Sequence, residues 1–126
     1  MSPIMFNGYP PSQSGYVWLV GAGPGAIDLI TMRGRQALAH AEVVLYDDLA
    51  NSELLEICAA GTEFIHVGKR AGRHSAPQDE INRLLVAHAR AGRRVVRLKG
   101  GDPTVFGRLG EEVQALRSAG IAFEVV

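Results

Sequence analysis

Residues 17–47 read VWLVGAGPGAIDLITMRGRQALAHAEVVLYD, and this stretch decides the fold. The apolar run at residues 17–20 predicts a short strand, which the glycine-rich segment 21–25 ends. Thr31 then offers an N-cap for a helix that reaches about His40, and the apolar residues 43–46 predict a second strand. Short apolar runs that alternate with helical segments indicate a parallel α/β sheet.

The same alternation continues to the end of the sequence. Further apolar runs predict strands at residues 63–67, 94–98 and 122–126. Capping residues and apolar side chains at helical spacing predict helices that end at Gly61, Gly92 and Gly120. Asn51 or Ser52 would cap the first of these, and Pro77 would take the first position of the second. The expected fold is a parallel, or mostly parallel, five-stranded sheet flanked by helices.

The length of 126 residues suits one domain. Residues 1–15 are rich in proline, serine and glycine, so we expect a flexible lead-in that stays outside the fold. Residues 16–126 would then form a single α/β domain.

Composition excludes several classes of protein. The 13 basic and 13 acidic residues balance, so the chain lacks the overall field of a general nucleic-acid binder. Its single cysteine, Cys58, allows neither an internal disulfide nor a cysteine-cluster metal site, and favours the reducing cytoplasm. The four histidines show no paired ligand spacing, so we expect no metal. No signal peptide or membrane-spanning segment is expected either.

Unusual polar segments follow four of the predicted strands. They are GAGPG at residues 21–25, Asp47, GKRAGRH at residues 68–74 and KGGDP at residues 99–103. In a parallel sheet, segments that leave the carboxyl ends of strands meet at one edge, where open α/β folds bind ligands. One ligand cleft explains the four segments better than four separate accidents.

Each segment also has simpler interpretations. The glycines could serve only for a tight turn and close packing, and the basic residues could form a solvated loop. Gly21, Gly23 and Ala26 also fit the loose G-x-G-x-x-A pattern of dinucleotide folds, with Asp47 or Asp48 as a ribose acceptor. A dinucleotide-binding oxidoreductase module is therefore one alternative, and a non-catalytic binding module is another.

Four segments read together resemble a known family. VWLVGAGPGAIDLITMRG, VVLYDDLA, HVGKRAGRHSAPQDEIN and VVRLKGGDPTVFGRLGEE resemble, in order and spacing, the N-terminal half of the uroporphyrinogen-III C-methyltransferases, a branch of the tetrapyrrole methylases. The resemblance implies transfer of methyl groups from S-adenosylmethionine to two pyrrole carbons of uroporphyrinogen III. The product would be precorrin-2, which supplies siroheme or cobalamin synthesis, and no metal is implied.

The resemblance also implies roles for single residues. Asp47 matches the proton acceptor and Lys69 the proton donor of the family. Contacts to the methyl donor are implied for Pro24, Gly100, Gly101, Asp102 and Val105. The substrate carries many carboxylate arms, so Arg70, Arg73 and His74 are expected to bind it, a task that suits the guanidinium fork.

The sequence departs from the family pattern in two ways. Leu109 stands where the family usually has a glycine, which could change the start of the following helix. The sequence also ends where the family's second α/β domain would follow, and the donor cleft lies between the two domains. We therefore expect this chain alone to bind the donor poorly and to turn over little. An exposed sheet edge would favour homo-oligomers.

Overall fold

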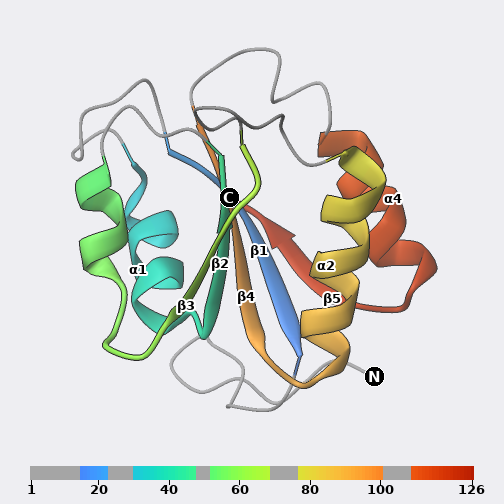
Figure 1. Cartoon of the computed structure of the whole chain (residues 1–126), viewed down its shortest axis with the longest axis horizontal. Coiled ribbons are helices and arrows are strands. Elements are labelled where there is room, and N and C mark those ends of the chain that lie inside the picture. Colours follow the sequence, from blue (N-terminus) through green and yellow to red (C-terminus); the bar gives the residue numbers. More distant parts are fainter. Residues whose placement is uncertain (1–14, 23–29, 48–51, 69–76, 101–108) are drawn as a thin grey trace.

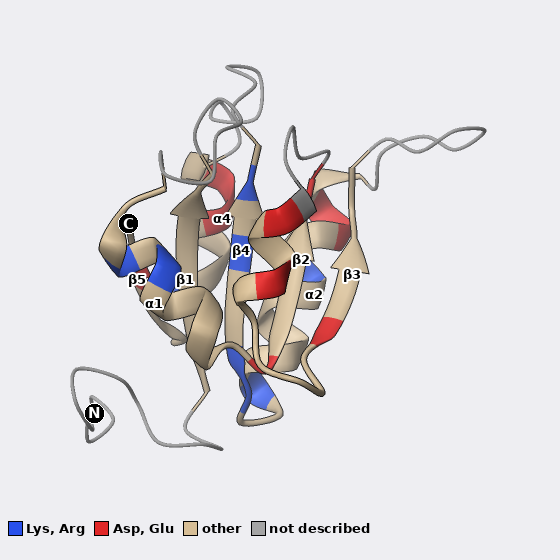
Figure 2. Cartoon of the chain, turned by 90° about the vertical axis from the view of Figure 1, so that its left-hand side faces the viewer, with Lys and Arg blue, Asp and Glu red and all other residues tan. Residues whose placement is uncertain are grey.

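The computed structural model describes residues 15–22, 30–47, 52–68, 77–100 and 109–126. Over these residues the chain forms a five-stranded sheet in which all paired strands run parallel. The strands are β1 (Tyr16–Gly21), β2 (Val43–Tyr46), β3 (Glu63–His66), β4 (Arg94–Lys99) and β5 (Ala122–Val125). Their order is β3-β2-β4-β1-β5, and Figure 2 shows β4 in the middle of the sheet, between β1 and β2. The expected α/β class and parallel sheet are confirmed.

Helices cover both faces of this sheet (Figure 1). The helix α1 (Met32–His40) and the 3-10 helix η2 (Ser52–Ile57) lie on one face. The helices α2 (Gln78–Arg90) and α4 (Leu109–Ser118) lie on the other. The inner strands β1, β2 and β4 are mostly buried, which explains why they are rich in apolar residues, whereas the edge strands β3 and β5 are partly exposed.

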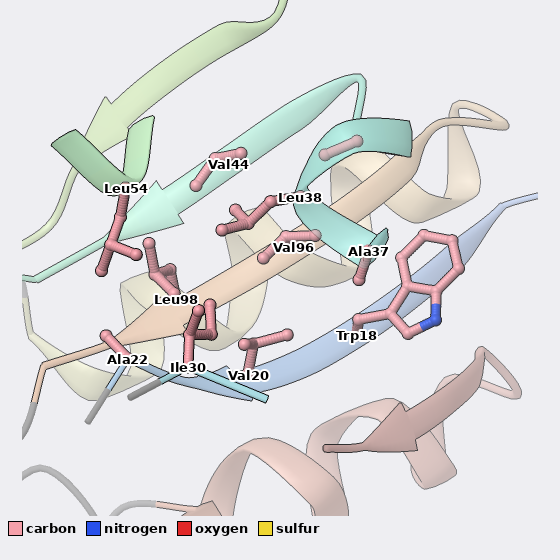
Figure 3. Packing of buried hydrophobic residues seen from close by; sticks show 11 residues of the cluster. Trp18, Val20, Ala22, Ile30, Ala37, Leu38, Val44, Leu54, Val96 and Leu98 are labelled. Atoms are coloured by element: carbon pink, nitrogen blue, oxygen red, sulfur yellow. The ribbon is translucent and has the colours of Figure 1, made fainter. Parts of the chain in front are cut away.

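Two hydrophobic clusters fill the space between the sheet and its helices. Side chains alternate along a strand, so Trp18 and Val20 of β1 face α1, whereas Val17 and Leu19 face α2 and α4. Figure 3 shows the first cluster, in which Leu38 packs above the strands. Full burial of an apolar side chain of this size stabilises the fold by about 1.5–3 kcal/mol.

The ends of the helices follow the expected capping chemistry. The Thr31 hydroxyl accepts a hydrogen bond from the amide of Gly34 at 3.0 Å, so Thr31 caps α1 as predicted. Gly34 lets α1 approach the sheet, because a Cβ there would lie 2.8 Å from Cγ1 of Val20. Gly92 follows α2 with a φ of 86°, a left-handed conformation that favours glycine.

Two predicted helix boundaries are wrong. The helix expected to run from Asn51 or Ser52 to Gly61 is a six-residue 3-10 helix, Ser52–Ile57. Leu54 is buried, and Leu55, Ile57 and Cys58 pack against the same cluster, so the apolar side chains are present. The segment closes with a bond of the 3-10 type, from the Cys58 amide to the Leu55 carbonyl at 3.3 Å, and does not continue as an α-helix. Pro77 precedes the second helix instead of taking its first position, and its carbonyl accepts hydrogen bonds from the amides of Glu80 and Ile81.

Candidate functional site

The ends of the central strands are joined by backbone hydrogen bonds at one edge of the sheet. The amide of Ala22, after β1, donates to the Lys99 carbonyl at 2.8 Å. The amide of Asp47, after β2, donates to the Leu98 carbonyl at 3.3 Å. Gly100 directly follows β4 and is buried. The segments that follow these strands therefore start from the same edge.

Two of the candidate site residues, Asp47 and Gly100, lie in the described part of the chain. The other candidates lie outside it: Pro24, Lys69, Arg70, Arg73, His74, Gly101, Asp102 and Val105. The site can therefore be built from Asp47, from the buried strand end at Gly100 and from what surrounds them.

Asp47 is nearly buried, with 8% of its surface exposed. One carboxylate oxygen, Oδ1, lies 2.7 Å from Nη1 of Arg97, which projects from β4, the strand beside β2. The other oxygen, Oδ2, is buried and has no hydrogen-bond partner among the described residues. A carboxylate with one oxygen held and the other open is suited to accept a proton from a bound molecule.

Arg97 belongs to a buried charge cluster formed by Asp47, Arg97, Lys99 and Glu112. Nε of Arg97 donates to Oε2 of Glu112 at 3.0 Å, and Nζ of Lys99 lies 2.8 Å from Oε1 of the same carboxylate. Glu112 comes from α4 and is fully buried, and Arg97 and Lys99 are each 2% exposed. The basic positions lie on the central strand β4 (Figure 2). Two cations and two carboxylates make the cluster neutral, which is how charges are tolerated inside a protein.

A side-chain amide completes the surroundings of Glu112. Nε2 of Gln78, the first residue of α2, donates to Oε2 of Glu112 at 3.2 Å and to Oδ1 of Asn82 at 2.8 Å. Glu112 thus receives contacts from α2 and from two positions of β4. Its carboxylate is fixed from both the sheet and the neighbouring helix.

Burial and charge act in opposite directions on Lys99. Burial lowers the pKa of the Lys99 ammonium, and the nearby Arg97 charge lowers it as well. The hydrogen bond and the charge of Glu112 raise this pKa, as does the charge of Asp47. Since burial is the largest of these effects, the pKa stays below its ordinary value of 10.5.

Arg97 and Glu112 were not among the residues predicted for the site, and Lys99 was noted only as the first residue of KGGDP. The signal was present in the alternation of β4, because Arg97 and Lys99 share a face with the buried Val95. Likewise, Glu112 lies one helical turn before the buried Leu116. A charged residue at a position that faces the core indicates a paired internal charge.

Other candidate chemistry is not found in the described residues. These residues contain no group of three or more His, Cys, Asp and Glu that could hold a metal ion. Burial raises the pKa of the Cys58 thiol to about 11, so little of it is the nucleophilic thiolate near neutral pH. None of the described helices is long and apolar enough to cross a membrane.

The parallel sheet and the carboxylate at its carboxyl edge define an α/β domain of the kind that binds ligands beyond its strand ends. The family model of the Tetrapyrrole (Corrin/Porphyrin) Methylases matches residues 16–126. The chain belongs to the tetrapyrrole methylase family, and the resemblance seen in the sequence is confirmed.

Individual relatives agree with this family. The siroheme synthase of Pseudomonas putida (strain W619) is 54% identical over 122 residues, which cover 97% of this chain and 26% of that protein. A crystal structure of uroporphyrin-III-C-methyltransferase from Thermus thermophilus is 49% identical with a TM-score of 0.76, over 90% of this chain and 47% of that one. A structure of the Thermus thermophilus enzyme complexed with S-adenyl homocysteine is 47% identical with a TM-score of 0.69, over 89% of this chain and 44% of that one.

The chain spans about a quarter of the length of the curated relatives it matches. The relatives are methyltransferases and siroheme synthases by name, so they do not favour the alternative of a dinucleotide-binding oxidoreductase module.

Proposed function

We propose that this chain contributes to an S-adenosylmethionine-dependent C-methyltransferase that converts uroporphyrinogen III to precorrin-2, for siroheme or cobalamin synthesis. The family match and the names of the relatives support this reaction. The observation that carries the proposal is Asp47, a nearly buried carboxylate at the carboxyl edge of the sheet whose Oδ2 has no hydrogen-bond partner among the described residues. Such a methylation needs a proton acceptor, because the pyrrole gains a positive charge with the methyl group and must then lose a proton.

Asp47, Arg97 and Gly100 can each be given a role in this reaction. When bound, S-adenosylmethionine supplies an electrophilic methyl group, and its sulfur keeps the electron pair of the broken bond. Oδ2 of Asp47 takes a proton that the methylated pyrrole system loses, while Arg97 holds Oδ1 and so fixes the direction of the carboxylate. The buried backbone at Gly100 lets a ligand approach the end of β4 closely.

The remaining roles are part of the same proposal. Residues 16–126 form the first α/β domain, which provides half of the donor pocket. Within it, the donor is contacted by Pro24, Gly100, Gly101, Asp102 and Val105. Lys69 acts as the proton donor. The carboxylate arms of the substrate are bound by Arg70, Arg73 and His74. The protein works in the cytoplasm as a homo-oligomer.

The reaction can be tested directly with the natural gene product that contains this sequence. Incubation with S-adenosylmethionine and uroporphyrinogen III under anaerobic conditions should give a product with two added methyl groups by mass spectrometry. The variant Asp47→Asn keeps the size of the side chain but removes the proton acceptor, so kcat should fall by about 10²- to 10⁴-fold. An active Asp47→Asn variant would overturn the role of Asp47, and an inactive wild-type protein would overturn the reaction.

A second experiment tests the half-pocket. Calorimetry of this 126-residue chain with S-adenosylhomocysteine should detect weak binding or none. Tight binding by the chain alone would contradict the proposal that the pocket needs a second domain.

A further inference from the structure

Arg33 and Arg97 contact carboxylates with different geometry. Arg33 of α1 grips Glu124 of β5 with two nitrogens, Nε at 3.1 Å from Oε2 and Nη2 at 2.9 Å from Oε1. This is the bidentate arrangement that a guanidinium normally prefers. Arg97 instead contacts two different carboxylates. Its Nη1 lies 2.7 Å from Oδ1 of Asp47, and its Nε donates to Oε2 of Glu112 at 3.0 Å.

The contacts of Arg97 with two carboxylates affect how Asp47 is held. Nε of Arg97 is bonded to Glu112, and Arg97 contacts one oxygen of Asp47, Oδ1. Oδ2 stays without a hydrogen-bond partner among the described residues, although it is buried. If both nitrogens gripped Asp47, both of its oxygens would be occupied.

Several contacts hold the Glu112 carboxylate beside Arg97. It is fully buried and held by Lys99 at 2.8 Å and by Gln78 at 3.2 Å, in addition to Arg97. These contacts come from β4 and α2, while Glu112 itself belongs to α4. The carboxylate cannot leave Arg97 without breaking contacts to two other elements.

We infer that Glu112 is a positioning residue for the proposed methyl transfer: by holding Nε of Arg97, it keeps Arg97 on one oxygen of Asp47 and leaves the other free to accept the substrate proton. The inference rests on the proposed function, since it assigns Asp47 the role of proton acceptor. It adds Glu112 of α4, which is far from Asp47 in the sequence, to the residues that support the proposed site at the carboxyl edge of the sheet.

Two conservative variants separate this role from a purely electrostatic one. Glu112→Gln keeps the length of the side chain and an oxygen that can accept from Nε of Arg97, but it removes the charge. The Glu112 carboxylate raises the pKa of Lys99 through its hydrogen bond and its charge, so its loss shifts Lys99 further toward the neutral amine. Glu112→Asp keeps the charge but is one carbon shorter, so it cannot hold Arg97 and Lys99 in their present places.

The two variants are assayed for methyl transfer in the natural gene product that contains this sequence. We expect Glu112→Gln to keep kcat within about threefold, and Glu112→Asp to lower kcat by about tenfold or more with little change in KM, because small misplacements of reacting groups cost that much. Glu124→Gln, which breaks the bidentate pair on β5, is the matched control and should leave kcat unchanged. If Glu112→Asp retains more activity than Glu112→Gln, the cluster needs charge balance rather than position, and the inference is overturned.

A spectroscopic readout on the 126-residue chain is independent of activity. The Nε–H signal of Arg97 should exchange slowly with solvent in the wild type and in Glu112→Gln, and faster in Glu112→Asp. The Nε–H signal of Arg33 should be the same in all three. An unchanged Arg97 signal in Glu112→Asp would overturn the inference. An inactive wild-type protein would overturn the proposed function together with the inference, whereas an active wild type with equally active variants would overturn the inference alone.

Discussion

Replacing Arg97 with methionine tests the energetics of the buried charge cluster. Methionine fills a similar volume but carries no charge, so among the described residues Asp47 and Glu112 are left with Lys99 as the cation of the cluster. The Arg97 and Glu112 side chains are 2% and 0% exposed, so water cannot compensate for the lost partner. Removing one partner from a buried pair costs about 3–5 kcal/mol, a large part of the roughly 5–15 kcal/mol that stabilises a typical domain.

The assay is urea unfolding followed by the fluorescence of Trp18, which is the sole tryptophan and is fully buried. The midpoint should move to lower urea with an unchanged slope, since the surface exposed on unfolding is nearly the same. Arg33→Met is the matched control, because it breaks the Arg33–Glu124 pair, whose side chains are 34% and 33% exposed. Partly exposed pairs contribute only about 0–1 kcal/mol. Equal losses in the two variants, or a loss below about 1 kcal/mol in Arg97→Met, would refute the reasoning.

Three further predictions concern other parts of the fold. Gly34→Ala should lower the free energy of unfolding by about 1–3 kcal/mol, because the new Cβ would lie 2.8 Å from Cγ1 of Val20. Thermal melts of the two variants measure the loss. Gly110→Ala is the control and should not destabilise the chain, because a Cβ there meets nothing within 4 Å. Equal losses of stability in the two variants would contradict the close contact at Gly34. The Cys58 thiol, with its pKa raised to about 11, should react with iodoacetamide near neutral pH only when the chain unfolds, and rapid labelling of the folded chain would count against this. Burial lowers the pKa of His88 below 6.5, so this histidine binds a proton more readily in the unfolded chain than in the folded one. The free energy of unfolding should therefore fall as the pH drops from about 7 to about 5. His88→Gln should weaken this pH dependence. An unchanged dependence in urea titrations of that variant would contradict the assignment.

Local chemistry made much of the fold predictable. The alternation of apolar runs and helical segments located all five strands to within about one residue at most ends. Thr31 and Gly92 marked helix ends because their side chain and backbone satisfy specific geometric needs. The pattern failed at η2, where apolar side chains pack on the core as expected but the backbone forms a short 3-10 helix.

The arrangement around Asp47 could not be predicted in the same way. The order β3-β2-β4-β1-β5 places β2 beside β4, and the spacing of residues along the sequence does not reveal this neighbour. Without that pairing, the sequence does not indicate that Arg97 contacts Asp47, or that Glu112 contacts Arg97. The alternation of β4 showed which face Arg97 would take, but the partner depends on the tertiary fold.

The strand order also determines when the sheet can assemble during synthesis on the ribosome. β1 is made first, yet its neighbours in the sheet are β4 and β5, and Val17 pairs with Val95. The β2–β3 pair can close early, whereas β1 must wait for most of the described strands to emerge. Such distant pairing slows folding and exposes the apolar β1 to aggregation until β4 arrives, so we expect the nascent chain to depend on chaperones during this interval.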